Sequence, residues 1–68
     1  MSDVYKLTEI VGTSNQSAEA AIQAALDRAK KTLRAIRWFH VTDTRGYVGD
    51  DGTVEFQVTL KIGFAIDD

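Results

Sequence analysis

The sequence has 68 residues, a formal net charge of -2 at pH 7, one His and no Cys. The missing Cys excludes disulfides and thiolate metal sites, and one His with scattered carboxylates gives no metal-ligand spacing. The acidic balance argues against a nucleic-acid partner, and no apolar stretch approaches the roughly 20 residues that a membrane span requires. We therefore expect a cytoplasmic protein with one domain, residues 1–68, supported by oligomerisation because so short a chain buries little surface alone.

The first predicted strand covers residues 4–11. Tyr5, Leu7 and Val11 alternate with polar residues, but Val4 and Ile10 make the second face partly apolar as well. Such a pattern suits a strand that a helix covers on one side and another subunit covers on the other. An ordinary strand with a few exposed apolar residues explains it equally well.

Residues 12–17 are predicted to form a turn and the start of a helix, with Ser14, Asn15 and Ser17 as candidate N-caps. The helix is expected to run from Ala18 to about Ile36 because apolar residues recur at three- and four-residue spacing. These residues are Ala18, Ala21, Ile22, Ala25, Leu26, Ala29 and Leu33. Four of the seven are alanine, so the helix can approach a sheet closely.

The second predicted strand, residues 36–48, holds the sole Trp and the sole His. Alternation places Phe39 and Val41 on a core face and Trp38 and His40 on the opposite face. Gly46 predicts a bend or bulge partway along this strand.

A hairpin turn over residues 48–53 leads into a third strand, residues 53–66. Its alternation is strict, with one apolar face formed by Val54, Phe56, Val58, Leu60, Ile62 and Phe64.

One helix can cover only one face of the resulting sheet. The other face bears Trp38, His40, Gln57 and Thr59, a mixture of apolar and hydrogen-bonding groups that is typical of a site for a flat heteroaromatic ligand. His40 and Asp43 are three residues apart in a strand, so we expect them on opposite faces and predict no catalytic base with an orienting carboxylate. No catalytic residue is therefore expected.

Nearly the whole chain resembles the dodecin family of small flavin-binding proteins. The matching segments are residues 4–6, 9–14, 20–26 and 31–33, Trp38-Phe39 with Val41, Arg45-Gly46, and residues 55–58. The resemblance implies an α+β fold of order β-α-β-β, with a three-stranded antiparallel sheet partly wrapped around one helix. It also implies assembly into a hollow homododecamer.

The function implied by the resemblance is non-catalytic binding and storage of riboflavin or FMN. Paired isoalloxazine rings would stack between tryptophans of two subunits, and Trp38 takes that role here. Gln57 matches the glutamine that hydrogen-bonds the polar edge of the ring system, and Arg45 corresponds to a basic position near the flavin phosphate in some relatives. His40 stands beside the ring where a carboxylate is common. Ala65 stands where some relatives have arginine, which leaves the choice of riboflavin or FMN open.

Two alternatives remain. Some bacterial dodecins bind coenzyme A, so the chain could be a coenzyme A-binding member with weak flavin affinity, with Lys30, Lys31 and Arg34 as anion contacts. The same basic residues also suit a solvated helix end. The second alternative is a structural oligomeric module whose Trp38 face only mediates subunit contacts.

Overall fold

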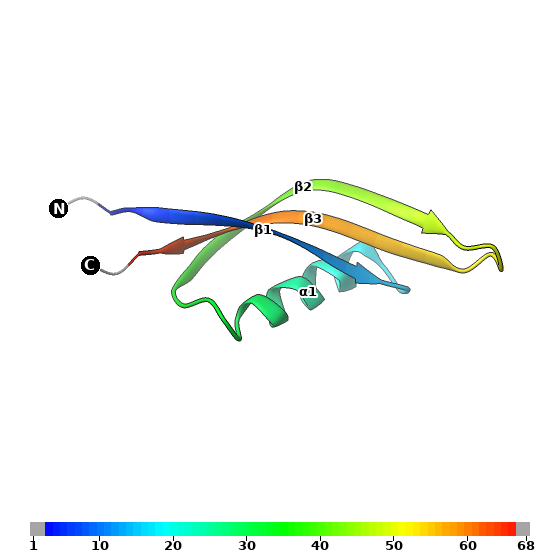
Figure 1. Cartoon of the computed structure of the whole chain (residues 1–68), viewed down its shortest axis with the longest axis horizontal. Helices are drawn as coiled ribbons and strands as arrows, with labels where there is room; N and C mark the ends of the chain where they lie inside the picture. Colours follow the sequence, from blue (N-terminus) through cyan, green and yellow to red (C-terminus); the bar gives the residue numbers. More distant parts are fainter. Residues whose placement is uncertain (1–2, 67–68) are drawn as a thin grey trace.

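The computed structural model describes residues 3–66. The elements are β1 (Tyr5–Ser14), α1 (Ala18–Ala29), β2 (Ile36–Val48) and β3 (Val54–Ala65). The strands form one antiparallel sheet in the order β1-β3-β2, and α1 lies against one of its faces (Figure 1). The β-α-β-β fold predicted from the sequence is therefore confirmed. Within residues 3–66, no helix is both long enough and apolar enough to cross a membrane.

The core lies between α1 and the central strand β3. Val58, Leu60 and Ile62 of β3 are fully buried, and they face the buried stripe of the helix formed by Ala21, Ala25 and Ala29. The small alanine side chains allow the helix to lie close to the sheet, as the composition of the stripe predicted.

Gly12 of β1 marks the closest approach of the helix to the sheet. A Cβ at this position would lie 2.9 Å from the Cβ of Ala25 and would overlap the carbonyl oxygen of Ala21. Gly12 is therefore required by packing, and it lies within the strand rather than in a turn.

β1 is longer and α1 is shorter than the sequence predicted. β1 continues to Ser14 because its last residues stay paired with β3. Ser17 is the N-cap of α1, and its hydroxyl accepts a hydrogen bond from the Ala20 amide at 3.0 Å. The helix ends at Ala29, where the Leu33 amide donates to the Ala29 carbonyl at 2.8 Å and the chain turns toward β2.

β2 has its predicted bounds, but its irregularities lie elsewhere than expected. The pairing register with β3 shifts at Arg37 and again at Thr42, so these two residues are bulged out of the ladder. Gly46 pairs regularly with Phe56, so no bulge occurs at Gly46. The Thr42 hydroxyl donates to the carbonyl of Thr59 at 3.3 Å, which ties the second bulge to the central strand.

The predicted faces of β2 are correct, but Phe39 is not part of the core. Phe39 and Val41 pair with buried residues of β3 and so point to the helix side. Val41 packs against the core, whereas Phe39 stays 46% exposed. The reason is that α1 packs over β1 and β3, and β2 is an edge strand beyond it.

The β2–β3 connection is the predicted hairpin turn. Gly52 has φ 85°, a conformation that glycine adopts without strain, and the Gly49 amide donates to the Thr53 carbonyl at 2.7 Å. The Asp51 carboxylate accepts from the Thr53 amide at 3.0 Å. Hydrogen bonding to the Thr53 side chain, and then to the Thr53 amide, lowers the pKa of Asp51.

We expect Gly12→Ala to destabilise the protein by about 3 kcal/mol, because an added methyl group has no room beneath the helix. Gly46→Ala is the matched control, since a Cβ there would meet only the Glu55 carbonyl oxygen at an ordinary 3.7 Å. Chemical denaturation at one fixed protein concentration measures both variants. Equal stability of the two variants would contradict the close approach of α1 at Gly12.

Candidate functional site

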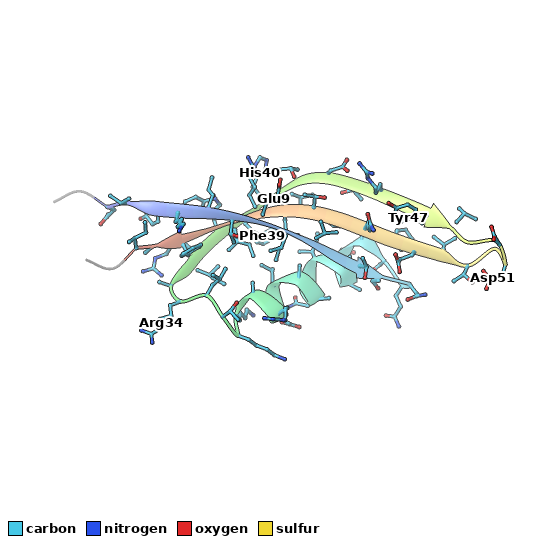
Figure 2. All side chains as sticks on the ribbon, viewed as in Figure 1. Glu9, Arg34, Phe39, His40, Tyr47 and Asp51 are labelled. Carbon is cyan, nitrogen blue, oxygen red and sulfur yellow. The ribbon has the colours of Figure 1, made fainter. Side chains whose placement is uncertain are left out.

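The face of the sheet turned away from α1, called the outer face from here on, carries the predicted site residues. Val58, Leu60 and Ile62 point toward the helix, so the intervening residues of β3 point outward. Strand pairing arranges the outer face in cross-strand rows. The rows are Leu7–Gly63–Trp38, Glu9–Lys61–His40, Val11–Thr59–Asp43 and Thr13–Gln57–Arg45. In Figure 2, His40 lies on the side of the sheet away from α1, and Phe39 lies on the helix side.

The indole of Trp38 lies flat on the backbone of β3. Trp38 pairs with Gly63, and a Cβ built on Gly63 would lie 2.6 Å from Cδ2 of the indole and closer still to Cε2 and Cζ2. Such contact with three atoms of the fused ring system requires that the ring face, not its edge, covers Gly63. The side chain remains 42% exposed. One face of the indole is therefore covered by the sheet, and the other is open.

Tyr5 of β1 is the aromatic neighbour of Trp38. The two ring centroids are 5.1 Å apart with an interplanar angle of 69°, an edge-to-face contact. The residues come from opposite edge strands and meet above β3, where the outward positions are Gly63 and Ala65. A side chain at Gly63 would occupy the place of the indole.

His40 and Asp43 lie on the same face of the sheet, which corrects the expectation of opposite faces. The bulge at Thr42 adds one residue between them, so His40 pairs with Lys61 and Asp43 pairs with Thr59. Asp43 nevertheless interacts with Arg45 rather than with His40. The strand alternation from which the absence of a catalytic pair was predicted is therefore wrong for these two residues.

Arg45 forms an ion pair within its own strand. Its Nε and Nη2 atoms both lie 2.9 Å from Oδ2 of Asp43, and this hydrogen-bonded carboxylate raises the pKa of the guanidinium. The side chains of Arg45 and Asp43 are 61% and 46% exposed, so the pair is weak and can open for a competing anion.

One chain does not bring all four predicted site residues together. His40 lies one row from Trp38, whereas Gln57 and Arg45 share a row six residues along β3 from Gly63. At the rise of a β-strand, six residues span about 20 Å. This separation is longer than the three fused rings of an isoalloxazine. Trp38 and Gln57 of the same chain are therefore not neighbours on the outer face.

Tyr5 and Gly63 are contact residues of Trp38 that the sequence reasoning missed. Alternation does place Tyr5 on the same strand face as Leu7 and Val11, and Gly63 on the polar face of the third strand. The missing information was the strand order β1-β3-β2 and its register, which set Tyr5 and Trp38 on either side of β3.

A cavity of about 530 Å³ opens on the helix side, between β1 and α1. Its lining is mostly apolar, with Arg28, Thr8 and Thr32 among the polar residues. Lys30, Lys31 and Arg34 do not line it. Among residues 3–66, no group of three or more His, Cys, Asp or Glu side chains could hold a metal ion.

Comparison with known proteins gives a single family. The family model of dodecins matches residues 4–67. The dodecin of Thermus thermophilus is 53% identical over 68 residues, which are 100% of this chain and 99% of that protein. A calcium dodecin of Mycobacterium tuberculosis is 33% identical over 61 residues, 90% of this chain and 86% of that protein. The structure of the dodecin from Streptomyces davaonensis superimposes with a TM-score of 0.92 at 38% identity and covers 100% of both chains.

Proposed function

Because the chain belongs to the dodecin family, we propose that it is a non-catalytic protein that binds, stores and buffers riboflavin or FMN. The observation that carries the proposal is the indole of Trp38, which rests on Gly63 with its other face open. An aromatic platform of this kind binds flat heteroaromatic rings by stacking. An indole in contact with an excited flavin also returns it to the ground state by transient electron transfer. Storage on Trp38 would therefore protect the flavin from photochemistry.

Each flavin site is proposed to form between two chains. Trp38 of one chain supplies the stacking surface, and Gln57 of a second chain hydrogen-bonds the polar edge of the ring system. The separation of about 20 Å between these positions within one chain supports this division. A two-fold axis that relates the chains would place two tryptophans around a pair of flavins.

The exposed surface of the single chain supports assembly, and a hollow homododecamer is the proposed form. The chain measures 54 × 20 × 14 Å and exposes 5051 Å², whereas a compact monomer of its mass would expose about 4,200 Å². Large apolar side chains are exposed on both faces of the sheet. They include Leu7, Val11 and Tyr47 on the outer face and Phe39, Val48 and Val54 on the helix side.

Coenzyme A binding remains a prediction. Lys30 is paired with Asp27 at 3.9 Å, and both side chains are well exposed, as expected for a solvated helix end. The structure therefore does not favour an anion site over a solvated helix end as the interpretation of Lys30, Lys31 and Arg34.

We expect Trp38→Ala to weaken riboflavin binding about 5- to 150-fold, the range for loss of one stacked ring. Titration of riboflavin with flavin-stripped protein, followed by flavin fluorescence, measures the affinity. Size-exclusion chromatography of the variant shows whether assembly is intact, so that a loss of stacking is separated from a loss of the oligomer. An oligomeric wild-type protein that leaves flavin fluorescence unchanged would support the structural module instead.

Mixed oligomers test whether Trp38 and Gln57 act from different chains. Trp38→Ala and Gln57→Ala chains should each bind riboflavin weakly. Refolding the two variants together in equal amounts should restore about a quarter of the strong sites, because chains pair at random and only one of the four ordered pairings supplies both residues to a given site. Each restored site would take its indole from one variant and its amide from the other. If the two residues acted within one chain, mixing would restore none.

Asp43→Asn should shift ligand preference toward FMN. Removal of the carboxylate frees the guanidinium of Arg45 for the flavin phosphate, and we expect the ratio of FMN to riboflavin affinity to rise about two- to fivefold. Parallel titrations with the two flavins measure the ratio, and Arg45→Gln should lower it in either background. A ratio unaffected by both substitutions would remove Arg45 from the phosphate site.

A further inference from the structure

The position of the Trp38 indole depends on residues of two other strands. Its closed face lies on Gly63 of β3, and its aromatic neighbour is Tyr5 of β1. Neither contact is local in sequence, since 25 positions separate Trp38 from Gly63 and 33 separate it from Tyr5. The orientation of the indole is thus a property of the assembled sheet.

The central strand is adapted to this contact by its small outward residues. At Gly63 any side chain would occupy the place of the indole, because even a Cβ would overlap the ring. The next outward residue is Ala65, which pairs with Tyr5. Tyr5 and Trp38, on strands that flank β3, can therefore meet directly above it.

We propose that Tyr5 and Gly63 are positioning residues, which hold the Trp38 indole flat on the sheet so that only one of its faces can receive a ring. This inference rests on the proposed function for the identity of that ring, a flavin. An indole that is fixed before binding loses less conformational freedom when the ligand stacks, so the affinity is higher than for a freely rotating tryptophan. The closed face also limits each tryptophan to a single stacked flavin.

Three variants test the role of these residues. Tyr5→Ala should weaken riboflavin binding about two- to tenfold, the range for loss of an edge-to-face aromatic pair. Tyr5→Phe should retain wild-type affinity, because the contact requires the ring and not the hydroxyl. Gly63→Ala should weaken binding at least as much as Tyr5→Ala, since its methyl group displaces the indole.

The flavin-free protein gives an independent reading of the same proposal. Near-ultraviolet circular dichroism and time-resolved fluorescence anisotropy report the order of the sole tryptophan. Tyr5→Ala and Gly63→Ala should reduce the indole circular dichroism and add a fast component to the anisotropy decay, whereas Tyr5→Phe should not. These signals decide the positioning role even if the wild-type protein fails to bind riboflavin, a result that would overturn the proposed function alone.

Size-exclusion chromatography of every variant shows whether folding and assembly are intact. If Tyr5→Ala fails to assemble, Gly63→Ala decides the question, because its substitution adds only a methyl group on the outer face. An ordered indole and wild-type affinity in Gly63→Ala, or in an assembled Tyr5→Ala protein, would overturn the role of that residue.

Discussion

The close packing of α1 on β1 and β3 is the constraint on which the rest of the structure depends. Ala21 and Ala25 approach Gly12 so closely that no side chain fits between them, and Val58, Leu60 and Ile62 are thereby fully buried. One short helix completes the core on one side of the sheet. It follows that the entire outer face, with Trp38, is left for contacts that the single chain does not provide.

The alternation of β3 could be read from the sequence because a half-buried strand repeats every two residues and this strand has no interruption. The apolar stripe of the helix was equally clear, but its end was not. Leu33 continues the helical spacing although it lies beyond the last helical residue, where it packs on the core from the following turn. The spacing of apolar residues thus indicates which residues are buried, but it does not indicate whether the backbone at each of them is helical.

The face of the sheet that carries the candidate site residues was predictable from the sequence, and their arrangement on that face was not. Residue type and alternation placed Trp38, His40 and Gln57 on one face. The bulge at Thr42 has no recognisable pattern in the sequence. It places Asp43 on the outer face, beside Arg45, whereas strand alternation predicted the opposite face. The contact of Trp38 with Tyr5 depends on strand order and register, which bring together residues from opposite edges of the sheet. Long-range pairing of this kind has no local pattern in the sequence.

The irregularities of β2 also bear on how sheets of neighbouring molecules meet. A regular edge strand offers a continuous row of free amides and carbonyls to which a strand of another molecule can add. β2 is interrupted at Arg37 and Thr42, so such a strand could not stay in register along it. β1 is paired with β3 without a register shift from Tyr5 to Ser14, and its outer edge has no comparable interruption. Unwanted strand addition, and with it aggregation, is therefore expected to begin at β1 rather than at β2.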